Sequence, residues 1–250
     1  MHGARGALRK VTVIVLGAWS AASADAADWS TKAEAGLVAA RGNTHTDTAN
    51  AKLDVARTSE RWKNSAALSG VYAADEEGAI TQRWDVRLQT EYTFDERSFS
   101  FASARYEDDR FGGFDYQATF AAGLGRRFIE TERTKLNGQL GVGYKVIQRE
   151  DTFSDDGLEF IPGEREEDVV GQGLVEFEHA LTDNTRVRNK FLTEATSANT
   201  SLQNDLSLQV NMTEILALAL GYSVRYNTQP PDGFKKRDML STVNLVLEIK

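Results

Sequence analysis

Apolar and polar residues alternate one by one along most of this chain, and this period of two limits the folds open to it. From Glu214 to Tyr226, every second residue belongs to an apolar face made of Leu216, Leu218, Leu220, Tyr222, Val224 and Tyr226. Successive side chains of a β-strand point to opposite faces, whereas side chains on one face of a helix recur about every 3.6 residues. A helix would place Arg83, Arg87 and Glu91 among apolar residues on every face. The pattern therefore predicts half-buried strands.

Such alternating runs cover most of the chain after its first residues. They lie near 30–41, 47–58, 62–73, 82–93, 97–107, 114–128, 134–149, 167–180, 185–196, 200–211, 214–227 and 238–250. An even number of antiparallel strands closes into a barrel without an unpaired edge.

The predicted connections differ in length at the two ends of the strands. Short turns follow the even-numbered strands, as at Asp95–Glu96 and Thr182–Asn184. Most odd-numbered strands are followed by longer polar loops, namely Ala74–Thr81, Asp108–Gly113, Asp151–Glu166 and Thr228–Arg237, although Gly42–Thr46 and Ser197–Asn199 are short. Outer-membrane barrels have short turns in the periplasm and longer loops outside. We predict an all-β fold, a closed antiparallel transmembrane β-barrel of about 12 strands with this orientation.

The first 24 residues have the pattern of an export signal. Arg5, Arg9 and Lys10 precede an apolar stretch, and Ala22-Ser23-Ala24 offers the small residues of a cleavage site, with Ala24-Asp25-Ala26 as a second option. We predict a cleaved signal peptide over 1–24 and a single outer-membrane barrel domain over 25–250. The chain has no cysteine, so the exported protein needs no disulfide to fold, which suits a bacterial envelope.

Composition excludes several other classes. The net charge of −8 argues against nucleic acid as a partner. The absence of cysteine excludes a disulfide scaffold and a cysteine zinc site. No apolar run reaches the roughly 18 residues of a membrane-spanning helix, and barrel strands never contain such runs.

Aromatic residues gather near the ends of the predicted strands. They are Trp62, Tyr72, Trp84, Tyr92, Phe94, Phe99, Tyr116, Phe128, Tyr144, Tyr222 and Tyr226. We place all of them on the apolar face, where they would form the two interfacial girdles of a membrane barrel. The alternative is a soluble periplasmic β-barrel whose apolar face points inward around an apolar ligand.

Several segments are similar to those of one known family. They are Glu34-Ala35-Gly36-Leu37 with Gly42-Asn43-Thr44-His45-Thr46, Ser65-Ala66-Ala67-Leu68, Glu107-Asp108-Asp109-Arg110-Phe111, and Gly123-Leu124-Gly125-Arg126-Arg127. Over residues 30–250 the chain resembles the DUF481 family of Gram-negative outer-membrane proteins, often called YdiY-like or salt-induced. The resemblance implies an outer-membrane β-barrel in contact with lipid and lipopolysaccharide, and it brings no enzymatic residues.

The C-terminus departs from what such barrels commonly show. They end in an aromatic residue. The barrel-assembly machinery, their expected partner, recognises this residue. This chain keeps the alternation but ends Leu247-Glu248-Ile249-Lys250.

The eighth and ninth predicted strands carry the candidate functional site. One face of these two strands holds five charged residues, Glu176, Glu178, Arg186, Arg188 and Lys190. A three-residue turn at Thr182–Asn184 fixes a register that pairs Glu178 with Arg188 and Glu176 with Lys190. We expect an acidic–basic ladder on the inner wall. It would either set up a transverse field in a narrowed pore or neutralise itself and fill the barrel.

The residues indicate neither catalysis nor a metal or cofactor. His45 and His179 have no supporting Ser or Asp constellation and no metal-ligand spacing. The acidic segment 150–168, with Asp155-Asp156-Gly157, has the composition for a hard cation but not the spacing of a calcium loop, so we interpret it as solvated surface. We expect a non-enzymatic barrel.

Two functions are consistent with such a barrel. It is either a narrow pore for ions or small polar solutes, or an envelope structural or stress protein. Barrels of twelve strands lie between filled barrels of about 8 strands and open porins of about 16–18. A barrel enzyme acting on lipid through His45 or His179 is the weaker alternative.

Overall fold

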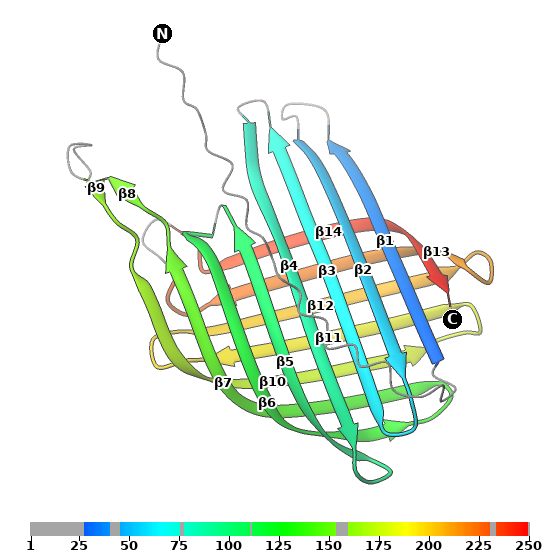
Figure 1. Cartoon of the computed structure of the whole chain (residues 1–250). Coiled ribbons are helices and arrows are strands. Elements are labelled where there is room, and N and C mark those ends of the chain that lie inside the picture. Colours follow the sequence, from blue (N-terminus) through cyan, green and yellow to red (C-terminus); the bar gives the residue numbers. More distant parts are fainter. Residues whose placement is uncertain are drawn as a thin grey trace.

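The structure, a computed structural model, is a closed barrel of long antiparallel strands (Figure 1). It describes residues 28–40, 46–75, 78–110, 112–153, 160–230 and 234–249. The predicted signal peptide, His45, Asp155-Asp156-Gly157 and Lys250 lie outside the described residues. Within the described part of the chain, no helix is long and apolar enough to cross a membrane.

The barrel strands follow one another around the wall in chain order. They are β1 (Asp28–Ala40), β2 (Thr46–Thr58), β3 (Trp62–Asp75), β4 (Gly78–Thr93), β5 (Ser98–Asp109), β6 (Phe114–Glu130), β7 (Thr134–Arg149), β10 (Arg165–Ala180), β11 (Thr185–Ala195), β12 (Thr200–Asn211), β13 (Leu216–Asn227) and β14 (Arg237–Ile249). β1 pairs with β14 and closes the barrel. A separate two-stranded hairpin, β8 (Thr152–Phe153) with β9 (Phe160–Ile161), lies in the longest loop. The predicted closed antiparallel barrel of 12 strands is confirmed.

The largest departure from the predicted strands lies between β3 and β4. The sequence predicts a polar loop over Ala74–Thr81, but β3 continues to Asp75 and β4 begins at Gly78. A bulge after Ala73 shifts the register, and Gly78 has a φ of 134°, which glycine adopts without strain. A bulge and a glycine thus extend the hairpin through residues whose polarity indicates a loop.

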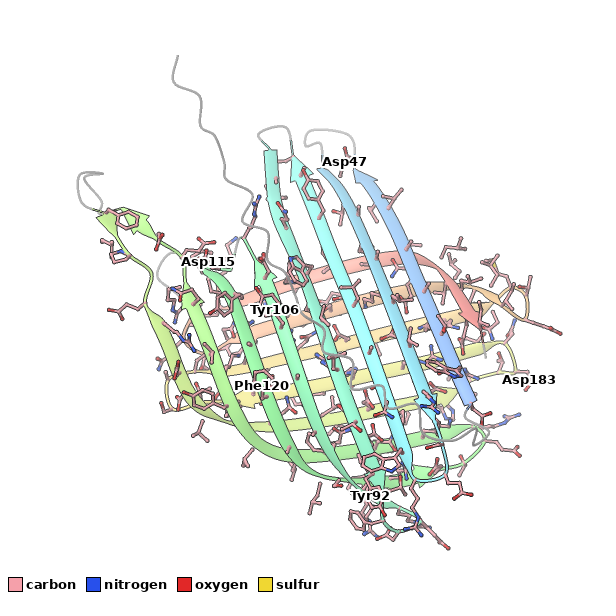
Figure 2. The ribbon with its side chains drawn as sticks, viewed as in Figure 1. Asp47, Tyr92, Tyr106, Asp115, Phe120 and Asp183 are labelled. Atoms are coloured by element: carbon pink, nitrogen blue, oxygen red, sulfur yellow. The ribbon has the colours of Figure 1, made fainter. Side chains whose placement is uncertain are left out.

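The outer surface of the barrel is apolar and its interior is polar. Leu140, Val142 and Leu124 are 76%, 70% and 63% exposed on the outside, and Phe120 points outward from β6 (Figure 2). Glu107 and Gln209, by contrast, are buried inside. This arrangement matches a barrel in lipid, and it is the opposite of what an apolar ligand in the lumen would need.

Outward aromatic residues lie toward both ends of the strands. Near the short turns, the rings of Trp62 and Tyr92 are 4.9 Å apart. Near the other end, Trp84, Tyr106 and Tyr116 form a row with ring separations of 5.3 and 5.6 Å. Figure 2 shows Tyr92 and Tyr106 at these two levels. Aromatic residues at two levels are typical of interfacial girdles.

Phe99 does not belong to these girdles, and its predicted outward position is wrong. Its ring faces the lumen and is 2% exposed. A Cβ atom on Gly125 would lie 2.3 Å from Phe99 Cζ, so the ring occupies space that only glycine leaves free. Phe101 uses Gly141 in the same way, at 2.8 Å. The guanidinium of Arg127 lies 5.0 Å from the Phe99 ring centre and gives this ring a cationic neighbour.

Candidate functional site

The five predicted site residues lie on the inner wall where β10 meets β11. The register pairs Glu178 with Arg188 and Glu176 with Lys190. Lys190 Nζ is 3.0 Å from Glu176 Oε1, and Arg188 Nε is 2.7 Å from Glu178 Oε2. Arg186 Nε is 3.3 Å from the other oxygen of Glu178. The structure therefore brings all five into two clusters of ion pairs.

The hairpin turn closes this register, and an amide pair lies on the outer face of β11. The backbone N–H groups of Leu181 and Thr182 both donate to the carbonyl of Thr185, which closes the turn. The Asn189 amide on this face has a partner. Asn189 exchanges two hydrogen bonds of 3.2 Å with Asn204 on β12. A mutual amide pair removes much of the cost of placing these polar groups on an apolar surface.

The side of the lumen next to β5, β6 and β7 is filled. The rings of Phe99 and Phe101 occupy it from β5. Lys145 on β7 lies 3.0 Å from Glu194 on β11, and both side chains are buried. This pair crosses in front of β10, which separates β7 from β11 in the wall. Buried ion pairs and aromatic rings leave little room for solute on this side.

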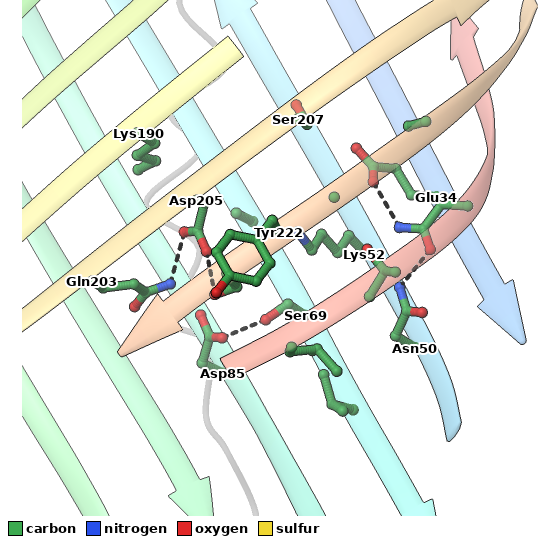
Figure 3. A pocket seen from close by; sticks show the side chains of 18 of the residues that line it. Glu34, Asn50, Lys52, Ser69, Asp85, Lys190, Gln203, Asp205, Ser207 and Tyr222 are labelled. Carbon is green, nitrogen blue, oxygen red and sulfur yellow. Dashed lines mark hydrogen bonds between the residues drawn. The ribbon is translucent and has the colours of Figure 1, made fainter. Parts of the chain in front are cut away.

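The side of the lumen bordered by β1 to β4 contains two polar cavities. Their volumes are about 240 and 300 Å³. The first lies toward the long loops and is lined by Glu34, Asn50 and Lys52 (Figure 3). The second lies toward the short turns and is lined by Lys32 and Glu91. The lumen is therefore asymmetric, with one filled side and one side that holds space.

Four residues line both cavities, and we call them the junction: Asp54, Ala67, Arg87 and Lys190. The register pairs Asp54 with Ala67 and Ala67 with Arg87, so these three lie side by side on β2, β3 and β4. Lys190 comes from β11, which stands on the opposite wall from β3. Because Ala67 has only a methyl group, it leaves space between the two charged side chains.

A chain of hydrogen bonds forms the wall of the first cavity where the barrel closes. The β1–β14 ladder extends from Thr31–Ile249 only to Ala35–Leu245. Next to it, Asn50 Nδ2 donates to Asn244 Oδ1 at 2.9 Å, and Asn244 Nδ2 donates to Glu34 Oε2 at 3.1 Å (Figure 3). Side-chain hydrogen bonds thus continue the closure beyond the last backbone pair of the β1–β14 ladder.

The loop-end rim beside β5 to β7 is acidic. Glu150 follows β7, and its pKa is raised by partial burial and by the charges of Asp115, Asp109 and Asp108. Within the described residues, no cluster of three or more His, Asp or Glu side chains could hold a metal ion. The described part of this rim is therefore acidic but forms no metal site.

Only part of the predicted ladder borders open space. Glu176 lines the second cavity and Lys190 lines both. Arg188 instead donates to Gln209 Oε1 at 2.7 Å and lies 4.0 Å from Glu248, so it links β11 to β12 and β14.

Sequence reasoning missed Asp54 as a site residue. It placed Arg87 on the polar face of its strand but did not connect it with a site.

Comparison with known proteins identifies one family. The family model described as "Protein of unknown function, DUF481" matches residues 33–249. YdiY of Escherichia coli (strain K12) is 22% identical over 214 residues, which cover 84% of this chain and 79% of YdiY.

Solved structures with a similar fold are also barrels. The translocator domain of the autotransporter NalP from Neisseria meningitidis has a TM-score of 0.51 at 15% identity, covering 87% of this chain and 86% of that one. The COG4313 outer membrane channel from Pseudomonas putida F1 has a TM-score of 0.50 at 9% identity, covering 93% and 98%. At these identities the likeness concerns the fold alone.

Proposed function

The chain belongs to the DUF481 family, and from this premise we propose that it is an outer-membrane β-barrel that admits ions or small polar solutes along one side of its lumen. The observation that carries this proposal is the pair of polar cavities that share the junction residues. Together they extend from residues near the short turns, such as Lys63, to residues near the long loops, such as Arg83. A small displacement of the junction side chains would connect them.

The outer surface supports the membrane location. An apolar belt with aromatic residues at two levels suits a lipid bilayer and its interfaces. The expected partners are outer-membrane lipid and lipopolysaccharide, with the barrel-assembly machinery during insertion. The predicted signal peptide over 1–24 would deliver the chain to the envelope.

The charged inner wall supports a narrow path. Lys190 stands opposite Asp54, and each of the two cavities has lining groups of both signs. A solute passing the junction would experience a transverse field between the two walls. The volumes of about 240 and 300 Å³ restrict the path to small solutes.

A structural role without conduction is the second candidate, and one contact favours it. Arg225 on β13 reaches Glu107 on β5 across the lumen, at 2.8 Å. This bridge and the filled side would strengthen an envelope barrel that passes nothing. A conductance measurement separates the two candidates.

We also propose that the barrel is not an enzyme. His179 is on the outward face at the short-turn end of β10, where its Nδ1 is 2.9 Å from the hydroxyl of Thr134. This hydrogen bond fixes the His179 ring on the outer surface at the rim. A nucleophile with its general base would instead have to lie together in a cavity that a substrate can enter.

Cell fractionation tests the location. The proposal expects the protein in outer-membrane fractions, with a gel mobility that changes on heating because the folded barrel resists detergent. Recovery as a soluble periplasmic protein without detergent would contradict it and revive the soluble alternative.

Cysteine labelling tests the orientation, because the chain has no cysteine of its own. Asp183 lies at the rim opposite Asp47 (Figure 2). On intact cells an impermeant maleimide should label Glu164→Cys but not Asp183→Cys. Labelling of Asp183→Cys but not of Glu164→Cys would show that the barrel has the opposite orientation in the membrane.

A further inference from the structure

Two charged side chains of the junction, Asp54 and Arg87, form no direct contact with an opposite charge among the described residues. Within the part of the chain that the structure describes, neither Asp54 nor Arg87 makes a hydrogen bond or an ion pair. Neighbouring lumen charges do: Asp85 accepts from Ser69, and Lys190 pairs with Glu176. The Asp54 side chain is exposed to the lumen and that of Arg87 is partly exposed, so a solute in the cavities can reach both. An acid and a base thus border the same two cavities without pairing with each other, and one solute can contact both.

The backbone fixes the spacing of these two groups. Asp54 pairs with Ala67 and Ala67 with Arg87, so two strand spacings separate the two charged residues. Their Cα atoms are therefore about 10 Å apart. The short Asp54 side chain and the longer Arg87 side chain extend from either side of Ala67 into the lumen. Because no ion pair closes this gap, a few atoms of solute fit between them.

We propose that the junction binds a small zwitterion, whose carboxylate is held by Arg87 and whose ammonium group is held by Asp54. A guanidinium offers two parallel N–H donors that match the two oxygens of a carboxylate. A simple anion would leave Asp54 unpaired, and a simple cation would leave Arg87 unpaired. Only a solute with both charges satisfies both side chains at once. This inference rests on the proposed function and specifies the class of solute.

The other charges of the cavities are consistent with this ligand. Glu176 neutralises Lys190 on the opposite wall, at 3.0 Å. Lys52 also lacks an ion pair among the described residues, but it lines only the first cavity and lies beside Glu34 in the register. Lys52 would attract the carboxylate end toward the junction from the loop side. The carboxylate of the solute then moves from one cation to the next.

A binding titration with three solutes that share a three-carbon chain tests the site directly. The probes are β-alanine, which has both charges, and propionate and propylammonium, which have one each. With the refolded barrel in detergent, calorimetry should show β-alanine binding at least about tenfold more tightly than either single-charge solute. Equal binding of all three would overturn the proposal.

Variants then assign the binding to the two residues. Arg87→Gln and Asp54→Asn should each remove the preference for β-alanine. The matched control is Arg149→Gln, which removes a guanidinium that pairs with Glu166 at the rim and lines neither cavity. If Arg87→Gln does not reach the folded gel mobility, Arg87→Lys replaces it and should weaken β-alanine binding partially. Unchanged preference in folded Arg87 and Asp54 variants would refute the assignment.

Swelling of proteoliposomes separates this inference from the proposed function. Faster entry of β-alanine than of propionate and propylammonium supports both. Binding of β-alanine without any swelling refutes the pore and keeps the site. Swelling at one rate for all three solutes, without preferential binding, keeps the pore and refutes the site.

Discussion

Arg225 Nη1 on β13 lies 2.8 Å from Glu107 Oε1 on β5, although these strands stand on opposite walls of the barrel. Glu107 is 1% exposed and also accepts a hydrogen bond from Arg105 on its own strand. One carboxylate therefore holds two guanidinium groups and connects the two sides of the lumen.

Removal of this carboxylate should strongly destabilise the barrel. Glu107→Ala leaves two largely buried arginines, whose side chains are 12% and 17% exposed, without their shared partner, which costs roughly 3–5 kcal/mol. Arg225→Met should cost less, because Glu107 keeps Arg105. The free energy of unfolding, followed by tryptophan fluorescence in lipid vesicles, measures both. Glu166→Ala breaks an ion pair at the rim and should cost about 0–1 kcal/mol. A Glu107→Ala effect no larger than this control would contradict the account.

The contact between Phe99 and Gly125 should respond to side-chain volume. Gly125→Ala places a methyl group against the Phe99 ring and should lower the free energy of unfolding by about 1–3 kcal/mol. In a Phe99→Ala background, the same Gly125→Ala change should cost much less, because its steric partner is gone. Additive effects in this double-mutant cycle would show that the two positions do not meet.

The outer face should reject charge if it contacts lipid. Leu140 is 76% exposed on β7. In a bilayer, Leu140→Arg should cost about 2–4 kcal/mol if the site is near the midplane, whereas an exposed site in water changes stability by about 0.5 kcal/mol or less. Unfolding from vesicles distinguishes these outcomes. Glu164→Arg, at the rim, is the control and should be nearly neutral.

The turn between β4 and β5 should make a pH-dependent contribution. The Asp95 carboxylate accepts backbone hydrogen bonds from Arg97 at 2.7 Å and from Ser98 at 2.6 Å, which hold its pKa below the ordinary 3.8. A carboxylate with a lower pKa in the folded state stabilises that state above the unfolded pKa. This contribution is lost as the pH falls through the folded pKa.

The Asp95 variants separate titration from hydrogen bonding. The stability difference between wild type and Asp95→Ala should therefore be largest at neutral pH and shrink below pH 3.8. Asp95→Asn keeps an acceptor that does not titrate, so its difference from Asp95→Ala should stay constant over the same range. A wild-type advantage that grows on acidification would contradict the assigned bonds.

The strands and the β10–β11 register could be predicted because their signals are local. Alternation assigns each residue of β11 to one face, and the length of the turn at Thr182–Asn184 decides which of them meets Glu178. The two-residue period leaves no intermediate register. The ion pairs of Glu178 with Arg188 and of Glu176 with Lys190 follow these local features.

The space that accepts the Phe99 ring and the junction could not be predicted because both depend on distant strands. The two-residue period puts Phe99 on the same face as Arg105 and Glu107. Its ring fits there because Gly125 on β6 leaves space, and hydropathy contains no signal for this fit. Arg87 was identifiable as a polar-face residue, but its place beside Asp54 requires the registers of β2 with β3 and of β3 with β4. Lys190 comes near Asp54 and Arg87 only when the barrel is closed.

Single-channel conductance in planar bilayers tests the central claim most directly. The refolded mature chain should conduct, and Ala67→Trp should abolish most of that current, because the larger side chain fills the junction where the two cavities meet. Ala102→Trp, on the outward face of β5, is the control and should leave the current unchanged. A folded wild type that conducts nothing, or an Ala67→Trp variant that conducts as well as the wild type, would contradict a solute path through the junction.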